Sequence, residues 1–345
     1  MSREFEVLSI GNAIVDILSH VGEDFIVQHG LQKGTMRLVD ENQSRAMLAE
    51  LGETLQASGG SAANTAACIA SLGASSAYIG KVAEDALGAA FREDMERAGV
   101  EFASGAAFDA IPTANCLAVV TPDGERTMST FLGACRELGG ADIPENLVAA
   151  SDIVFLEGYL LDSGVSQTAI ASAVRFARKY GSRVALTLSD ANCVRRNRKA
   201  FKELIAVGLV DILIANEKEI VALLEDNEPG ITVEAAIEHY RSFDFTAVVT
   251  MGAHGAAAVE GGSVSRVEAF RVDRIVDLVG AGDSFAAGYL VGHARGLKPE
   301  DRLTLGAACA AEIITTNGAR PSRPLAELPS ASTILQQSAA PAPAE

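Results

Sequence analysis

The sequence predicts an α/β fold with a mostly parallel central sheet, helices on both faces and a small accessory β-sheet. Two observations carry this expectation. Short apolar runs alternate with helical stretches over nearly the whole chain, and two stretches interrupt that alternation. Short buried strands between helices are typical of parallel sheets that are covered on both faces. The 345 residues, 48% of them hydrophobic, suffice for a large core and exclude wholesale disorder.

The elements of the main sheet follow in chain order. The first apolar segment, Phe5–Ile17, is expected to open the sheet as a strand. An Ala-rich helix is expected over Ser61–Leu72, a strand over Tyr78–Val82, and then a helix over Leu87–Ala98 that Gly99 ends. Further buried strands, separated by helical segments, are expected at Asp152–Leu160, Arg183–Leu188 and Asp211–Ala215.

Two stretches interrupt the alternation and predict a small β-sheet that acts as a lid over the active edge. Residues 18–40 show no convincing helical pattern. Residues 110–132 contain a hairpin, in which the turn Thr121–Gly124 joins an apolar strand to a strand that ends at Phe131. A simple extension of the main sheet's edge is the alternative interpretation.

The chain shows no internal repeat, and we expect a single domain over residues 1–327. Residues 328–345 are rich in Ser, Ala, Gln and Pro, a composition typical of a disordered tail. Five scattered cysteines without a CxxC pair, and the lack of a signal-peptide core before Gly11, indicate a cytoplasmic protein with free thiols.

Charge and missing motifs exclude several classes of protein. The 28 Lys and Arg against 45 Asp and Glu leave a net charge of −17, which opposes binding to nucleic acid. No uncharged apolar run is long enough for a membrane span. The absence of HExxH, P-loop and GxGxxG motifs argues against zinc sites, Walker-type ATPases and simple NAD dehydrogenases.

The most informative segment is Asp277–Asp283, a glycine-rich turn that leads into a helix. Gly280 and Gly282 permit a tight turn whose amides point inward at the positive end of that helix. Such a turn binds anions, or stabilises the charge on a phosphoryl group in transfer. Asp283 follows where the same dipole stabilises a carboxylate. A role as the N-cap is the structural alternative for Asp283.

Two segments carry polar side chains that suit sugar hydroxyls. A glycine pair, Gly59 and Gly60, precedes an Ala-rich helix with Asn64 one turn inside. Small residues let a ligand approach the backbone, although close packing of a small-residue helix explains them equally well. Asn12 and Asp16 come at the end of the first apolar strand, and ligands bind at the carboxyl ends of strands in open α/β sheets.

Two further segments suit a nucleotide and its metal. Asn216 and Glu219 share one face of a helix that follows a buried strand, and such oxygen ligands can hold magnesium through its waters. A capping box explains the same spacing. The stretch from Thr250 through Gly252 to Gly255 is expected to be a strand end and turn, either a plain hairpin or a shelf for a nucleotide.

Together these segments resemble the ribokinase-like sugar and nucleoside kinases, also called the PfkB carbohydrate kinase family. Ser58–Asn64 is similar to the family's N-terminal Gly-Gly signature, and Asp277–Asp283 is similar to its Asp-x-x-Gly-Ala-Gly-Asp signature. Asn216–Glu219 matches its Asn-x-x-Glu motif. The order and spacing also agree, and the resemblance covers about residues 4–325. Within the family, Gly11–Asp16 most resembles the opening motif of adenosine kinases.

The resemblance implies a ribokinase-like fold and an ATP-dependent kinase that phosphorylates a primary hydroxyl of a nucleoside or sugar. Asp283 would take the hydroxyl proton, and the amides of Gly280, Ala281 and Gly282 would stabilise the phosphoryl charge. Arg126 on the lid hairpin would reach the transferred phosphate, unless it is a solvated turn residue. The residues expected to hold the sugar are Asn12, Asp16, Gly59, Gly60 and Asn64.

The same resemblance implies the cofactors. ATP would contact Asn216 and the turn that contains Thr250, Gly252 and Gly255. Mg²⁺ would bridge the phosphates, held through water by Asn216 and Glu219. Family members often use a monovalent cation such as K⁺, and Asn317–Ser322 could contribute to its site.

The acceptor expected from the resemblance is adenosine, which would become AMP, with a free sugar such as ribose or fructose as the alternative. Adenosine kinases place an aromatic pair near Glu157, where this chain has Tyr159 followed by Leu160. With 5% aromatic residues and no Trp, stacking surface for adenine is scarce. A non-catalytic sugar- or nucleoside-binding homologue is disfavoured because the base and the glycine turn are intact. We expect a monomer or a homodimer.

Overall fold

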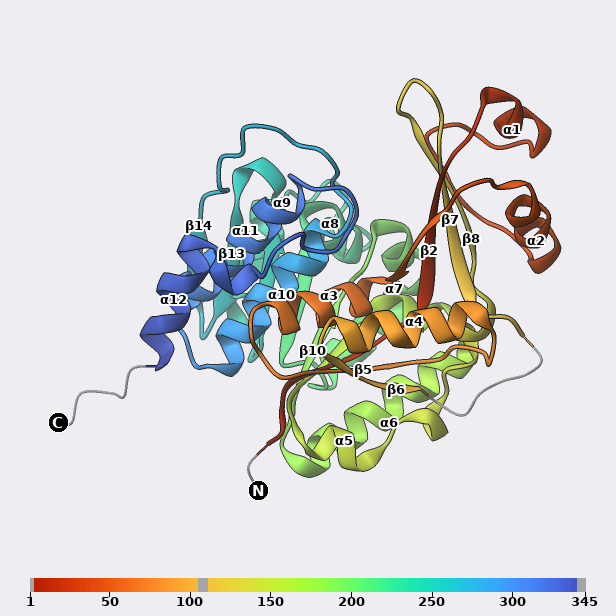
Figure 1. Ribbon diagram of the computed structural model, residues 1–345. Helices are drawn as coiled ribbons and strands as arrows, with labels where there is room; N and C mark the ends of the chain where they lie inside the picture. The colour runs from red at the N-terminus through yellow and green to blue at the C-terminus, as the bar shows by residue number, and fades with distance from the viewer. Residues whose placement is uncertain (1–2, 105–110, 340–345) are drawn as a thin grey trace.

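The computed structural model describes residues 3–104 and 111–339 and contains two β-sheets (Figure 1). The large sheet has nine strands in the order β14-β13-β12-β11-β10-β9-β1-β5-β6. These strands are β1 (Phe5–Ile10), β5 (Ser76–Gly80), β6 (Val100–Ser104), β9 (Ser151–Glu157), β10 (Arg183–Thr187), β11 (Ile212–Asn216), β12 (Thr246–Thr250), β13 (Ala256–Glu260) and β14 (Ser263–Val267). All pairs from β6 to β12 are parallel, and β13 and β14 add an antiparallel edge.

Helices cover both faces of the large sheet. One face carries α3 (Ser61–Ser71), α4 (Ala86–Arg97), α10 (Ala281–Ala294), α11 (Pro299–Ile313) and α12 (Pro329–Ala339). The other face carries α5 (Glu145–Ala149), α6 (Gly164–Tyr180), α7 (Ala191–Ala206), α8 (Glu217–Leu224) and α9 (Val233–His239). Short 3-10 helices occupy Gly133–Glu137, Gly140–Asp142, Gly158–Asp162, Tyr240–Ser242, Gly252–His254 and Leu325–Glu327.

Side chains of the central strands alternate between two buried clusters, one on each face. On β9, Ile153 and Phe155 belong to the cluster under α3, α10 and α11, whereas Val154 and Leu156 pack under α6, α7 and α8. Because both faces are buried, these strands are continuous apolar runs, which confirms the expected α/β fold with a mostly parallel sheet.

The second sheet is the expected small accessory sheet, which we call the lid, and it projects from one side of the main body (Figure 1). That it closes over the active edge stays a prediction. Its order is β3-β8-β7-β2-β4. Its elements are β2 (Ile14–His20), β3 (Met36–Leu38), β4 (Leu55–Gly59), β7 (Ala114–Val120) and β8 (Arg126–Phe131), with α1 (Glu23–Gln28) and α2 (Glu41–Glu50). β7 and β8 form the expected hairpin. Residue 110 of the expected lid segment lies outside the described residues.

Three expectations about elements are wrong. The strand expected over Phe5–Ile17 is two strands, and the chain passes from β1 in the large sheet to β2 in the lid. Residues 18–40 do contain a helix, α1, whose six residues are too few to show a periodic pattern. The expected tail begins with helix α12, because Ala331 and Ile334 are buried against the core. Residues 340–345 lie outside the described residues.

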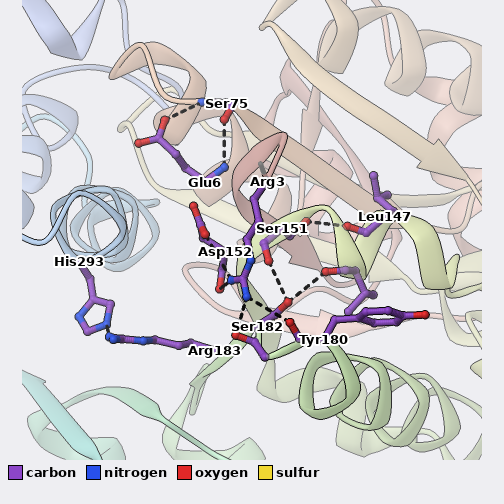
Figure 2. Close-up of polar contacts among 12 residues, drawn as sticks. Arg3, Glu6, Ser75, Leu147, Ser151, Asp152, Tyr180, Ser182, Arg183 and His293 are labelled. Atoms are coloured by element: carbon purple, nitrogen blue, oxygen red, sulfur yellow. Dashed lines mark hydrogen bonds and ion pairs between the residues drawn. The ribbon is translucent and has the colours of Figure 1, made fainter. Parts of the chain in front are cut away.

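Polar side chains tie the amino ends of the central strands together, at the edge opposite the candidate residues (Figure 2). Ser182 Oγ donates to the backbone oxygen of Ser151 at 2.8 Å, and Arg3 Nη1 donates to Asp152 Oδ1 at 3.2 Å. His293, near the end of α10, contacts Arg183, and burial lowers its pKa to about 3. Helix α10 therefore runs from one edge of the sheet to the other. In the described part of the chain, no helix is long and apolar enough to cross a membrane.

Candidate active site

The predicted site residues gather at the carboxyl edge of the large sheet. Asn12 follows β1, Asn216 ends β11 and Thr250 ends β12. Asp283 lies in the first turn of α10, on the same edge. Because these strands are parallel, their carboxyl ends share one edge, the usual place for a ligand in an open α/β sheet.

Asp283 is the third residue of helix α10 rather than its N-cap. Gly280 is the N-cap, its φ is +80°, and no side chain caps the helix. A Cβ on Gly280 would lie 2.5 Å from the Cβ of Ala319, so both the backbone angle and the close approach require glycine. The N-cap interpretation of Asp283 is therefore wrong.

The glycine turn leaves amides free for an anion. Ala281 N donates to Leu278 O at 3.3 Å, and Val279 N donates to Asp277 Oδ1 at 3.0 Å. The amides of Gly280 and Gly282 have no acceptor among the described residues. They lie at the positive end of α10, where an oxyanion is stabilised. That the amides of Gly280, Ala281 and Gly282 together hold a phosphoryl group stays a prediction.

Helix α3 supplies two hydrogen bonds to the carboxylate of Asp283. Ser61 Oγ donates to Oδ1 at 2.6 Å, and Asn64 Nδ2 donates to Oδ2 at 3.0 Å. Burial raises the pKa of Asp283, while these two donors and the nearby Arg320 oppose that rise. The N-terminal and C-terminal motifs therefore meet at one carboxylate.

Asn64 also carries an unused acceptor. The residue is 5% exposed, and its Oδ1 is buried with no donor among the described residues. A buried polar atom without a partner is costly unless a ligand or water supplies one. A sugar hydroxyl next to Asp283 would satisfy it.

Asp16 lies on lid strand β2 and faces the same region. Burial raises its pKa to about 6, and the charge of Asp283 adds to that rise, whereas Arg126 and Arg320 lower it. A Cβ on Gly59 would lie 2.3 Å from Asp16 Oδ2. The absence of a side chain at that position therefore makes room for the Asp16 carboxylate.

The second glycine of the pair is required by the backbone. Gly60 has a φ of +95°, and a Cβ there would lie 2.1 Å from the backbone oxygen of Asn12. This close approach joins the turn before α3 to the segment that follows β1. The glycine pair thus brings Asn12, Asp16 and Asn64 to one place, although their binding of a sugar stays a prediction.

Arg126, the first residue of β8, is not a solvated turn residue. Its Nη1 lies 2.9 Å from Asp277 Oδ2 in an ion pair, and its Nε is buried. Asp277 Oδ2 also accepts from Gly318 N at 3.1 Å. The lid therefore contacts the start of the glycine-rich segment.

Asn216 and Glu219 form a capping box at the start of α8. Asn216 Oδ1 accepts from Glu219 N at 3.0 Å, and Glu219 Oε2 accepts from Asn216 N at 2.9 Å. Burial raises the pKa of Glu219 to about 7, and the charges of Asp190 and Asp283 add to the rise. The capping interpretation of the spacing is confirmed.

A magnesium role for this pair stays a prediction. Within residues 3–104 and 111–339, no three His, Cys, Asp or Glu side chains cluster closely enough to hold a metal on their own. The two oxygens of Glu219 are already engaged with Asn216. The pair therefore fits a metal that carries its own waters and is held mainly by phosphate oxygens.

The Thr250–Gly255 stretch is a turn between β12 and the antiparallel β13. Met251 N donates to Gly255 O at 2.8 Å. Gly255 has a φ of +81°, and a Cβ there would lie 1.9 Å from the backbone oxygen of Val267. The hairpin interpretation is correct, and a role as a nucleotide shelf stays a prediction.

Two residues of the site were not identified from the sequence. Glu157, at the end of β9, is 1% exposed and accepts from Asn12 Nδ2. Arg320 donates to the backbone oxygens of Ser58 at 2.8 Å and Ala63 at 2.9 Å. A charged residue at the end of an apolar strand was the available signal for Glu157, whereas the contacts of Arg320 span more than 250 positions and leave no local pattern.

Leu160, which occupies the second position of the expected aromatic pair, provides no surface on which a nucleobase could stack. This residue is fully buried in the core beneath α6 and α7. Burial and the neighbouring Asp190 raise the pKa of Tyr159. The nucleobase of a nucleoside substrate would therefore need apolar contacts from other residues.

Known proteins resemble this chain in sequence and in fold. The model of the pfkB family carbohydrate kinases matches residues 34–326. The ATP-dependent ribose-1-phosphate kinase of Halopiger xanaduensis is 32% identical over 268 residues, which are 77% of this chain and 83% of that protein. Among solved structures, the adenosine kinase from Sinorhizobium meliloti is 40% identical, with a TM-score of 0.85 over 97% of this chain and 99% of its own. A probable sugar kinase from Rhizobium etli is 38% identical, with a TM-score of 0.86 over 96% and 99%.

Proposed function

This chain belongs to the pfkB family of carbohydrate kinases, and we propose that its acceptor is a nucleoside, with adenosine as the first candidate. The ribokinase-like fold expected from the sequence is confirmed. As a member of this family the protein is a phosphotransferase that uses ATP and an alcohol group.

Asp283 acts as the general base in this proposal. Its carboxylate takes the proton of the acceptor's primary hydroxyl while the hydroxyl oxygen forms a bond to the γ-phosphorus. The bond from the γ-phosphorus to the β–γ bridging oxygen breaks, and ADP leaves with that electron pair. The free amides of Gly280 and Gly282 stabilise the charge on the phosphoryl oxygens.

The acceptor's sugar is held by groups that have unused hydrogen-bonding capacity. Asp16 is a carboxylate that can accept from two neighbouring hydroxyls. The buried Oδ1 of Asn64 accepts a further one. Asn64 and Asp16 both lie close to Asp283. Asn64 donates a hydrogen bond to the Asp283 carboxylate, and the charge of Asp283 raises the pKa of Asp16.

One observation favours a nucleoside over a free sugar, namely the apolar face of the lid. Directly paired strand residues point to the same side of a sheet. The side of Asp16 therefore includes Ile14 and Leu18 on β2 and its partner Cys116 on β7. On the opposite side, α1 and α2 cover the lid.

The rest of this face is mainly apolar, although Thr130 on β8, the partner of Cys116, and His20 at the end of β2 also lie on it. Ala118 pairs with Met128 on this face. Among the residues of the five described lid strands, Asp16 and Arg126 are the only Asp, Glu, Lys or Arg residues on the face. A free sugar presents mostly hydroxyl groups to such a face, whereas the flat face of a nucleobase packs well against aliphatic and sulfur-containing side chains. The base would lie against these side chains rather than in an aromatic stack.

ATP and its metal complete the proposal. The nucleotide would lie along the turn from Thr250 to Gly255, on the edge that also carries Asn216. ATP-bound Mg²⁺ would offset the phosphate charge, with Glu219 contacting its waters. A monovalent cation such as K⁺ would bind near Asn317–Ser322, whose Gly318 already contacts Asp277.

An acceptor panel tests this proposal. Phosphorylation by Mg-ATP is compared for adenosine, inosine, ribose, fructose and ribose 1-phosphate at equal concentration. We expect the highest kcat/KM for adenosine. Turnover confined to a free sugar or sugar phosphate would contradict the nucleoside acceptor and leave the kinase assignment standing.

A further inference from the structure

Glu157 is a buried carboxylate that accepts hydrogen bonds from Asn12 and Ala62 and has no cationic partner among the described residues. Its Oε1 accepts from Asn12 Nδ2 at 3.0 Å, and its Oε2 accepts from Ala62 N at 3.0 Å. Among the described residues, no Lys or Arg contributes to the pKa shift of this carboxyl group. A Cβ on Gly11 would lie 2.3 Å from Oε2, so the chain leaves room for this carboxylate.

The ionised carboxylate determines which way the Asn12 amide points. A carboxylate can only accept, so the NH₂ group of Asn12 must face it. The Oδ1 of Asn12 then faces away, and no described residue donates a hydrogen bond to it. Asn12 is 8% exposed and lies against the glycine pair that leads into α3. Its oxygen is therefore available to the acceptor.

We propose that Glu157 is a positioning residue that fixes the amide orientation of Asn12, so that Asn12 presents a hydrogen-bond acceptor to a hydroxyl of the substrate. This inference rests on the proposed function and concerns the same site. Protonated Glu157 would donate to Asn12 Oδ1 and turn the NH₂ group toward the substrate. The substrate hydroxyl would then lose the acceptor for its proton.

The hydrogen bond from Ala62 N to Glu157 connects Glu157 to the residues that contact Asp283, the proposed general base. Ala62 N lies in the first turn of α3, between Ser61 and Asn64, which both donate to Asp283. By accepting from this amide, Glu157 holds the start of α3 against the end of β9. One carboxylate therefore orients residues on both of the proposed sugar-binding segments.

The orientation of the Asn12 side-chain amide should depend on pH near neutrality. Burial raises the pKa of Glu157 to about 7, and the charge of Asp283 on α10 adds to the rise. The other titratable groups that face it are Tyr78 on β5, Cys135 after β8 and the adjacent Tyr159. None of these is a cation. Glu157 should therefore become protonated when the pH falls slightly below neutrality.

The first variant is Glu157→Gln, which keeps the size of the side chain. Its amide oxygen can still accept from Ala62 N, but its NH₂ group faces Asn12 and requires Asn12 to turn round. We expect the KM for the best acceptor, and its Kd by titration calorimetry without ATP, to rise about tenfold or more, which corresponds to the loss of one hydrogen bond. The KM for ATP should stay unchanged and kcat should change much less.

A compensating variant separates positioning from structural damage. Adding Asn12→Asp to Glu157→Gln places a carboxylate opposite the new amide, with its second oxygen toward the substrate. The exchange restores the net charge and the acceptor, so KM and Kd should return to within about threefold of the wild-type values. Asn12→Asp alone sets two carboxylates against each other and should weaken binding further.

A matched control is Glu6→Gln at the opposite edge, where Glu6 accepts from Ser75 N at 3.0 Å (Figure 2). It should leave acceptor KM unchanged. Wild-type KM should rise as pH falls through 7, and Glu157→Gln should remove that dependence.

An unchanged acceptor Kd in Glu157→Gln, or a failure of the double variant to restore it in folded protein, would overturn the inference. A wild-type enzyme that turns over only a free sugar would contradict the proposed nucleoside acceptor, and the same comparison would then be made with that sugar.

Discussion

Arg126 on lid strand β8 and Asp277 at the start of the glycine-rich turn form an ion pair, with Nη1 2.9 Å from Oδ2. Asp277 also accepts from Val279 N and Gly318 N, so one carboxylate connects the lid, the glycine-rich turn and the segment after α11. Arg126 is thereby held beside the place where the transferred phosphoryl group is proposed to lie.

Arg126→Ala should lower kcat about 10- to 100-fold, because a charge-assisted hydrogen bond to the phosphoryl group is lost. Steady-state kinetics with the best acceptor measures this. Arg37→Ala is the matched control, since the Arg37 guanidinium donates to backbone oxygens of His29 and Gly30 within the lid. Equal effects of the two variants would indicate that Arg126 only stabilises the lid.

Glu219→Gln should raise the magnesium concentration needed for half-maximal rate, because a glutamine binds metal-bound water less strongly than a carboxylate does. Glutamine is also accepted at the third position of a capping box, so the fold should persist. Initial rates over a magnesium titration measure the effect. An unchanged magnesium dependence would leave Glu219 with the capping role alone.

The same variant should change how stability depends on pH. The pKa of Glu219 is raised from 4.5 to about 7, so the wild-type protein loses stability from this group as pH rises through that window. Glu219→Gln lacks this loss. Its stability relative to wild type should therefore increase between pH 4.5 and pH 7, by up to about 3 kcal/mol. Urea unfolding at several pH values measures this, and a flat difference would contradict the raised pKa.

Removal of the 2′-hydroxyl from the best nucleoside should cost about 2 kcal/mol or more in kcat/KM. Asp16 and Asn64 would be left with buried groups that lack a partner. Asp16→Ala should largely erase the preference for the hydroxyl. A preference that survives in Asp16→Ala would place the recognition of this hydroxyl elsewhere.

The sequence was informative where chemistry depends on local spacing. Gly60 and Gly280 could be recognised because a positive φ or a close approach leaves glycine as the fitting residue. Asn216 and Glu219 could be placed on one helical face for the same local reason. The alternation of strands and helices likewise predicted the large sheet.

Three features could not be predicted from the sequence because they depend on contacts between distant segments: the change of sheet after β1, the packing of α12 and the role of Glu157. Only residues 11–13 separate the apolar residues of β1 from those of β2, so hydrophobicity alone does not mark where the chain changes sheet. The composition of α12 suggested disorder, yet burial of Ile334 holds the helix on the core. Glu157 ends an apolar strand, and its importance follows only from its contacts with Asn12 and Ala62.

The central claim is that Asp283 is the base of a phosphoryl transfer, and Asp283→Asn tests it most directly. Asparagine has nearly the same shape, and its Oδ1 can accept from Asn64 Nδ2 while its NH₂ group donates to the Ser61 hydroxyl, so the melting temperature should change little. Steady-state turnover of Mg-ATP and the best acceptor should fall about 10²- to 10⁴-fold in kcat. A variant that keeps near-wild-type kcat would contradict the account.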